Sequence, residues 1–429
     1  MRTRVSLQRA RRVPAIVTIL TGTAVGQGLV IAVSPLLTRV YAPSDFGALA
    51  IVTALASIIG AWATLGSDRA VAVAPDRAAT ASLVVFGAAA TTCVAAVTSS
   101  VAWSCRAELS EWFRAPAVSD SWWVVPVTVF AVGLHRIGSA VLARRRQHGS
   151  IAVRNAAQGV AQTLWNMSMA FAGPIGLVAG LAVGRLAAIA GMLRTRPSVT
   201  SLPAPSVMWT TLRAHGRFVI VTPWSAALNV FGQQAPALLL AAMHGSVAAG
   251  FVALTMRVLG TPVGIVADAV AQYAAGAFGL RVRAGDPLGG LLTRFTSRLF
   301  LGGALAAILV LLLGPSVFAT VFGEDWRLSG TYAQILAPAF AVQVAVSPMT
   351  QVLSMLGRQA TQLSWDAGRL AATSAAVLVP STLGAPMHVV LVTLSATMVV
   401  SYLVMLVLVV VAARSPAPDR SCTEVPAPV

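Results

Sequence analysis

Twelve apolar segments, each long enough to cross a lipid bilayer as a helix, follow one another along this chain of 429 residues. The hydrocarbon core of a bilayer is about 30 Å thick and is crossed by roughly 20 helical residues. Lipid offers no hydrogen-bond partner to the backbone, so such segments must be helical. The predicted spans are residues 14–37, 46–66, 80–103, 122–143, 151–171, 174–193, 217–240, 247–276, 297–322, 331–356, 361–384 and 386–412. We therefore expect an all-α integral membrane protein of about 12 transmembrane helices.

Composition agrees and excludes several classes of protein. The chain is 57% hydrophobic and 10% charged, whereas soluble domains carry about 25% charged residues. A net charge of +17 would suggest nucleic acid as the partner of a soluble protein. Here cytoplasmic loops rich in arginine explain it, so we expect no nucleic-acid partner. The three cysteines have no metal-ligand spacing and there is no phosphate-binding loop, so no metal, cofactor or ATP hydrolysis is expected.

The arginines also predict the orientation of the spans. With both termini in the cytoplasm, nineteen arginines fall in inside segments and four in outside loops, Arg39, Arg106, Arg114 and Arg327. This asymmetry follows the rule that basic residues stay on the cytoplasmic side. We expect a multi-pass protein of the bacterial inner membrane, surrounded by membrane lipids, with cytoplasmic N- and C-termini.

The longest inside connection divides the chain into two sets of six spans. We predict an N-terminal lobe over 1–196, a cytoplasmic linker over 197–216, a C-terminal lobe over 217–413 and a disordered tail over 414–429. Within the linker, Ser206–Ala214 is either a short helix at the membrane surface or a plain loop. Phe46-Gly47 at the start of span 2 resembles Gly250-Phe251 at the start of span 8. An even number of spans in each half predicts parallel repeats, whose rocking opens a central cavity to alternate sides.

Charged and polar side chains interrupt the apolar spans at helical spacings. A charge at the bilayer centre costs about 2.5–3.5 kcal/mol on insertion scales, so such residues usually face protein or water. Arg154, Gln158, Gln162 and Asn166 share one face of span 5, and Arg185 lies in span 6. The other stripes hold Gln27 in span 1, Gln233 in span 7, Arg257 and Asp268 in span 8, Gln343 in span 10, and Asp366 and Arg369 in span 11.

Two interpretations of these stripes remain open for any single helix. Each stripe is either the lining of a polar cavity or a contact between helices. Asp366 and Arg369 are three residues apart and either neutralise each other or bind a ligand. Arg136 and Arg154 lie near the cytoplasmic ends of their spans, from which they can extend to the membrane surface. Since arginines outnumber acids within the spans, the stripes together favour a cavity for an anionic cargo.

Three stretches resemble a known family. The residues S-P-L-L-T-R-V-Y-A-P-S-D-F-G from Ser34 to Gly47 resemble the start of bacterial polysaccharide-biosynthesis membrane proteins of the O-antigen flippase type. Thr255–Pro262, T-M-R-V-L-G-T-P, resembles a motif of the eighth span of that family. Ser67–Pro75 resembles the region after the second span, although Asp68 here precedes Arg69 instead of following it. The family belongs to the multidrug/oligosaccharidyl-lipid/polysaccharide export superfamily.

The resemblance implies both fold and function. It implies two six-helix lobes around a central cavity, and transfer of an undecaprenyl-pyrophosphate-linked oligosaccharide from the inner to the outer leaflet. The matching cationic positions are Arg39, Arg69 and Arg257. With the polar stripes, the predicted substrate-binding residues are Arg39, Arg69, Arg154, Arg185, Arg257, Arg369, Gln158, Gln162 and Gln233. A polysaccharide polymerase and glycosyltransferases are the expected protein partners.

Other functions are weighed against this one. A proton- or cation-coupled drug antiporter of the same superfamily would need acids in its cavity. A membrane-embedded polymerase or ligase would need a larger outer loop than 104–121. A non-transporting scaffold for glycosyltransferases is an alternative that the sequence leaves open. If transport is driven by an ion gradient, Asp268 and Asp366 are the predicted coupling residues. Transport driven by consumption of the product outside needs neither.

Overall fold

The computed structural model describes Gly22 and residues 25–145, 147–193, 203–284, 289–356 and 358–414. Over these residues the chain is helical, with no strand. The first half contains α2 (Ser34–Leu37, the end of an apolar helix Val25–Leu37), α3 (Pro43–Gly60), α4 (Ser67–Val73), α5 (Arg77–Ser104), α6 (Arg106–Trp112), α7 (Pro116–Asp120), α8 (Val124–Arg144), α9 (His148–Ser168) and α10 (Pro174–Leu193). The second half contains α11 (Pro205–Ala214), α12 (Gly216–Ala284), α13 (Gly289–Phe322), α14 (Arg327–Val346), α15 (Thr350–Met355), α16 (Gln359–Thr382) and α17 (Met387–Arg414).

Each of the twelve predicted spans corresponds to a helix. Within the described residues, eight helices are long and apolar enough to cross a membrane by length and composition. One of them, in α12, covers two predicted spans. The remaining three predictions correspond to Val25–Leu37, α9 and α16. Because α9 and α16 carry the polar stripes, composition alone does not mark them as spans.

The two spans within α12 are separated at Gly245. This glycine has φ 84° and ψ 172°, a conformation far from helical, and it lies between the predicted spans 217–240 and 247–276. Residues that carry a side chain rarely adopt a positive φ, so glycine is the residue that permits this break. The break lets α12 run along both halves of the molecule, since its first part packs on α16 and its second part on α3 and α14.

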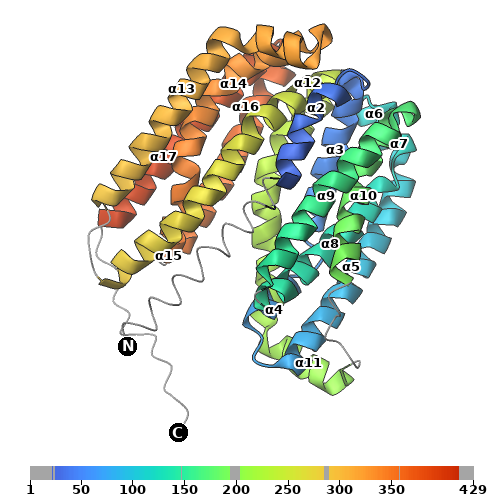
Figure 1. Cartoon of the computed structure of the whole chain (residues 1–429), viewed down its shortest axis with the longest axis vertical. Helices are drawn as coiled ribbons and strands as arrows, with labels where there is room; N and C mark the ends of the chain where they lie inside the picture. The colour runs from blue at the N-terminus through green and yellow to red at the C-terminus, as the bar shows by residue number, and fades with distance from the viewer. Residues whose placement is uncertain are drawn as a thin grey trace.

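The helices form two groups that meet at one end and spread apart toward the other (Figure 1). At the end where they meet, α3 crosses α12 with backbone in contact with backbone. A Cβ atom on Gly47 would collide with the carbonyl oxygen of Ser246, and one on Gly250 with that of Pro43. Each glycine thus faces the residue four positions before the other. The two resembling dipeptides of the sequence therefore touch each other in a two-fold arrangement.

Trp326 closes this end of the molecule. Its side chain is 1% exposed, and its indole Nε1 donates a hydrogen bond of 2.9 Å to the carbonyl oxygen of Thr38 in the other half. Its ring lies edge-on to Phe46, with centroids 4.9 Å apart, and to Phe251, with centroids 5.8 Å apart. We call Phe46, Phe251 and Trp326 the aromatic seal. It joins both halves because each contributes aromatic rings to one buried cluster.

Tyr41 ties the same region to α9. Its hydroxyl donates a hydrogen bond of 2.8 Å to the carbonyl oxygen of Asn166. Burial, and then the negative charge of Asp45, raise the pKa of the Tyr41 hydroxyl above its ordinary value. The hydroxyl therefore keeps its proton and remains a donor.

Loss of the aromatic seal is expected to separate the two halves. Trp326→Ala should shift the distance between spin labels at Ser44 and Leu328 to longer values, because truncating a fully buried tryptophan costs roughly 3–5 kcal/mol. Electron paramagnetic resonance in nanodiscs measures that distance. Trp112→Ala is the matched control, because Trp112 is 68% exposed. Equal distance distributions in wild type and Trp326→Ala would contradict a sealing role.

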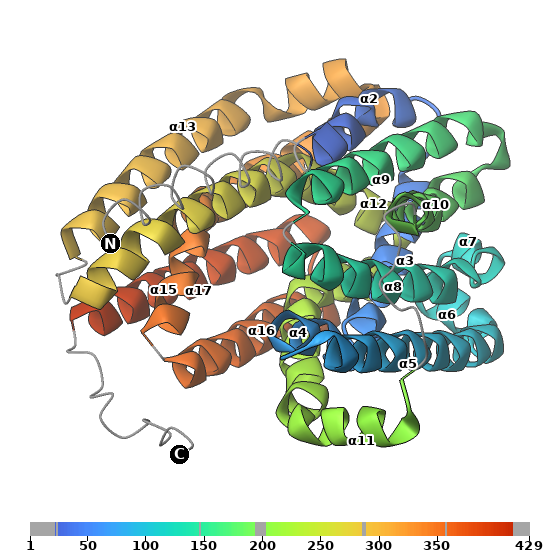
Figure 2. The same cartoon turned by 60° about the horizontal axis from the view of Figure 1, so that its bottom comes forward.

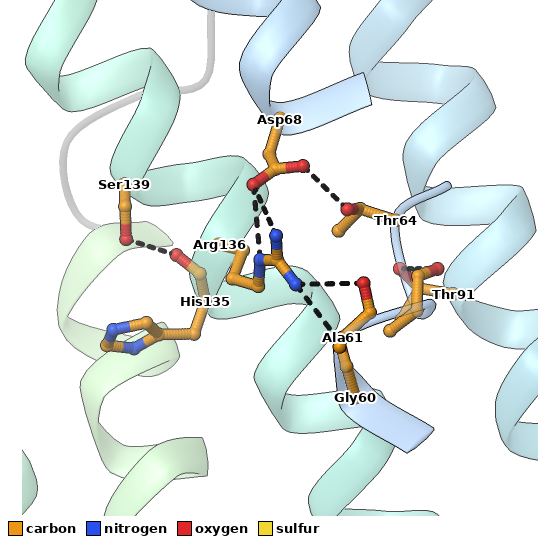
Figure 3. A network of polar contacts seen from close by, with 9 residues as sticks. Gly60, Ala61, Thr64, Asp68, Thr91, His135, Arg136 and Ser139 are labelled. Atoms are coloured by element: carbon orange, nitrogen blue, oxygen red, sulfur yellow. Dashed lines mark hydrogen bonds and ion pairs between the residues drawn. The ribbon is translucent and has the colours of Figure 1, made fainter. Parts of the chain in front are cut away.

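Arg136 forms a partly buried network of contacts within the protein. Its guanidinium binds Asp68 at 3.0 Å and donates to the carbonyl oxygens of Gly60 and Ala61 at 3.2 Å (Figure 3). Asp68 also accepts a hydrogen bond of 2.7 Å from Thr64. The network links the end of α3, the turn after it, α4 and α8. These partners within the protein hold the guanidinium of Arg136 at one position, which mobile lipid headgroups would not do.

The linker contains a helix, which decides between the two alternatives for 206–214. In α11 the guanidinium of Arg213 lies 5.3 Å from the ring centroid of Trp209, whose side chain is 61% exposed. The helix lies across the end of α5 (Figure 2). Its position at a membrane surface stays a prediction. The lobe boundary at 196–197 and the tail after Arg414 fall outside the described residues.

Candidate functional site

A polar cavity lies between the two halves, and we call it the central cavity. Its volume is about 350 Å³. Side chains from the helix before α2, α3, α8, α9 and α10 line it on one side and α12 lines the other. The polar lining residues are Gln27, Thr53, His135, Asn155, Gln158, Gln162, Arg185, Arg257 and Thr261. The polar stripes of α9 and α12 therefore line a cavity rather than only a helix contact.

Two arginines in the central cavity have hydrogen-bond donors without a protein acceptor. Among the described residues, no acceptor reaches Nε of Arg185 or Nη1 of Arg257, although both atoms are buried. Nδ1 of His135 also lacks a partner. No acidic side chain is among the lining residues that the structure describes. Because buried charges are normally paired, two guanidinium groups without a carboxylate make this cavity suited to an anion.

Arg154 lies beside the central cavity, and its guanidinium already forms hydrogen bonds within the protein. It is 7% exposed and donates from Nε and Nη2 to Oδ1 of Asn155, at 3.1 and 2.7 Å. Its Nη1 donates to the hydroxyl of Ser139. These contacts hold Asn155, which does line the cavity. Arg154 therefore acts on the cavity through its neighbour in this conformation.

A second polar cavity lies within the C-terminal half, and we call it the α16 cavity. Its volume is about 360 Å³, and Asp366 and Arg369 line it. Nη2 of Arg369 lies 3.8 Å from Oδ1 of Asp366. The other lining residues are Asn229, Gln233, Ala267, Gln343, Ser347, Thr350, Gln362, Trp365 and Tyr402. The stripes of spans 7, 10 and 11 thus converge on one volume.

A third cavity lies between α3 and α12, beside the central cavity. It measures about 410 Å³ and shares Leu49, Thr53, Arg257 and Thr261 with the central cavity. Its lining also includes Gln234, the neighbour of Gln233 in the α16 cavity. All three cavities are therefore lined in part by α12.

Four of the predicted residues are not among the described lining residues of these cavities, and Arg154, which lies beside the central cavity, is one of them. Arg39 and Arg69 are exposed, and neither is among the residues that line the three cavities. The side chain of Asp268 lies outside the described residues. Sequence reasoning missed Asn155 and Tyr402 as lining residues. Asn155 directly follows Arg154 in a membrane span, which is the signal that would have identified it.

Comparisons with known proteins support the same fold. A lipid II flippase, MurJ, in an inward closed conformation superposes with TM-score 0.75 at 8% identity, covering 92% of this chain and 87% of that one. An inward-facing multidrug resistance MATE family transporter of the MOP superfamily gives TM-score 0.64 at 12% identity, covering 92% and 94%. The MATE transporter VcmN of Vibrio cholerae in its bent form gives 0.51 at 14% identity, covering 96% and 99%. A comparison with curated protein sequences finds no match.

The fold is therefore that of the MOP superfamily, with two helical lobes around a central cavity. With the apolar helices described above, this fold makes the chain a multi-pass membrane protein. The profile of the polysaccharide biosynthesis protein family matches residues 36–331, more than half of the chain. The chain belongs to this family.

Proposed function

We propose that the protein moves an undecaprenyl-pyrophosphate-linked oligosaccharide from the inner to the outer leaflet of the bacterial inner membrane by alternating access. The observation that carries the proposal is the pair of guanidinium groups of Arg185 and Arg257, each of which has a buried donor that meets no acceptor among the described residues. A pyrophosphate bridging a lipid and a sugar carries one negative charge on each phosphate. Two arginines balance those charges and match the planar, two-pronged geometry of phosphate oxygens.

The physical need for such a cavity is clear from the substrate. Its pyrophosphate and hydroxyl groups would lose their hydration in hydrocarbon, at a cost that keeps spontaneous transfer slow. A polar cavity replaces water as their hydrogen-bond partner while the apolar chain stays in the bilayer. The glycosyltransferases that build the unit and the polymerase that consumes it are the proposed partners.

The direction of transport rests on the orientation of the chain. We place both termini in the cytoplasm, because arginines gather in the loops that this orientation puts inside. The aromatic seal then closes the outer end, where the arginine-poor loops lie. A cavity open to the cytoplasmic leaflet can receive a lipid-linked unit made there.

Reconstituted vesicles test the function. Purified full-length chain in proteoliposomes should make a fluorescent undecaprenyl-pyrophosphate disaccharide in the inner leaflet accessible to a membrane-impermeant quencher. Vesicles that contain Arg185→Gln/Arg257→Gln chain are the control. Protection of the probe equal to that in protein-free vesicles would contradict flipping. Export of a cationic dye in the same vesicles would instead favour the drug antiporter, for which Asp366 in the α16 cavity is the relevant acid.

The coupling role of Asp366 gives a separate prediction. If its protonation drives transport, Asp366→Asn should abolish the dependence of flipping on a pH gradient, because the amide carries no titratable proton. Initial rates measured with and without an imposed gradient provide the readout, with Asp268→Asn measured in parallel. A gradient response that persists unchanged in both variants would exclude coupling through these two carboxylates.

A further inference from the structure

The two polar cavities differ in charge, and this difference suggests different occupants. The central cavity has Arg185 and Arg257 without a described acid. The α16 cavity balances Arg369 against Asp366, whose side chains are 14% and 16% exposed and 3.8 Å apart. A site without net charge has little electrostatic preference for an anion. Its ligand is therefore better sought among neutral polar molecules.

The remaining lining of the α16 cavity has the chemistry that recognises hydroxyl groups. Four side-chain amides line it, and they belong to Asn229, Gln233, Gln343 and Gln362. An amide both donates and accepts hydrogen bonds, as a sugar hydroxyl does. Carboxylate and guanidinium add strong acceptors and donors without adding net charge.

Two buried polar atoms in this cavity lack a partner. Oε1 of Gln343 and Nε of Arg369 have no hydrogen-bond partner among the described residues. Gln343 contributes an unused acceptor and Arg369 an unused donor. Buried polar groups without partners are uncommon and indicate that something outside the protein satisfies them. A polyhydroxyl ligand supplies both kinds of partner.

Trp365 gives the cavity an apolar surface of fixed orientation. Its indole Nε1 donates a hydrogen bond of 2.9 Å to the carbonyl oxygen of Ser401, and the ring of Tyr402 lies 6.1 Å away. The guanidinium of Arg369 lies 4.9 Å from the indole centroid. A tryptophan held in this way presents its apolar body beside polar groups, and the C–H face of a sugar ring needs that combination.

We infer that the α16 cavity is the carbohydrate subsite of the transporter. The sugar unit contacts Gln343, Trp365 and the Asp366–Arg369 pair while the pyrophosphate lies at Arg185 and Arg257. The third cavity lies between α3 and α12, where it contains Arg257 together with Gln234, the sequence neighbour of Gln233 in the α16 cavity. This inference rests on the proposed function. It assigns the pyrophosphate to the cavity between the two halves and the sugar to a cavity within the C-terminal half.

Binding of two lipids to purified full-length protein in nanodiscs separates the subsites. One probe is undecaprenyl pyrophosphate, which has no sugar, and the other is the lipid-linked oligosaccharide extracted from the bacterium that carries this chain. Gln343→Leu and Trp365→Phe should each weaken binding of the sugar-bearing lipid about tenfold and leave Kd for undecaprenyl pyrophosphate unchanged. Gln334→Leu, on the same helix as Gln343 but outside the cavity lining, should change neither.

The outcomes distinguish this inference from the proposed function. Equal weakening of both lipids, or of neither, by Gln343→Leu and Trp365→Phe would overturn the carbohydrate subsite. A wild-type chain that binds neither lipid would overturn the proposed function itself. Arg257→Gln should weaken both lipids alike, since both carry the pyrophosphate. If Arg257→Gln weakens binding of neither lipid, the phosphate site lies elsewhere. The difference between the two lipids in Gln343→Leu and Trp365→Phe still tests the carbohydrate subsite.

Discussion

Arg257→Gln is expected to reduce export of the lipid-linked oligosaccharide roughly tenfold to a hundredfold, because hydrogen bonds to charged groups contribute about 1.5–3 kcal/mol each. Glutamine keeps a donor but loses the charge and the two-pronged geometry. Polymer at the cell surface and flipping in proteoliposomes both measure the effect. Protein abundance is measured alongside.

Stability gives this prediction a second readout. The buried Nη1 of Arg257 has no protein acceptor among the described residues, so the ligand-free protein gains nothing from that donor. Arg257→Met should therefore leave the melting temperature unchanged or raise it, while transport is lost. Arg327→Gln is the control, since this arginine is 54% exposed in an ion pair with Glu324. A marked fall in melting temperature on Arg257→Met would mean that the residue is structural.

Asp68→Asn and Arg136→Met are expected to lower the stability of the protein, in contrast to Arg257→Met. Removing one partner of a buried ion pair costs roughly 3–5 kcal/mol, because the other charge is left uncompensated. Side-chain exposures of 12% for Asp68 and 25% for Arg136 place the pair near that case. Both variants should lower the melting temperature in detergent and the yield of folded protein.

The double variant and a surface pair provide the controls. Asp68→Leu/Arg136→Met should recover much of the lost stability, since neither charge remains to be compensated. Glu324→Gln should leave stability nearly unchanged, because both side chains of its pair with Arg327 are exposed. Equal effects of Asp68→Asn and Glu324→Gln would contradict the structural role of the network in Figure 3.

Much of the fold follows from the sequence because lipid restricts the choices of the backbone. Apolar length predicted the spans, and the break near 241–246 falls at Gly245. The two-fold contact of Gly47 and Gly250 was visible only as a faint similarity of two dipeptides. Contacts of this kind depend on how close two backbones come, which no local pattern encodes. Trp326 gave no signal, since tryptophan near a span end is usual at membrane interfaces.

Lining residues of the cavities could be predicted where a charged or polar residue interrupts an apolar span. Arg185, Arg257, Gln158 and Gln162 line one cavity because helical spacing places stripes on single faces and lipid excludes them from the outside. Charges near span ends were not resolved by the same reasoning. Arg136 and Arg154 found partners in neighbouring helices, and those partners are distant in sequence or lie outside any pattern.

Gly47 contacts Ser246 in the way that Gly250 contacts Pro43, so the two halves contribute equivalent surfaces to their contact. Two identical proteins that form a homodimer make contacts of this self-complementary kind. A six-helix ancestor pairing with its own copy would already have possessed the joint, and fusion of the two copies would have freed each to diverge. The present chain retains the shared joint while its two polar cavities differ in chemistry. The cavity between the halves has two arginines, each with a donor that meets no acceptor among the described residues, and the cavity within the C-terminal half has a balanced ion pair.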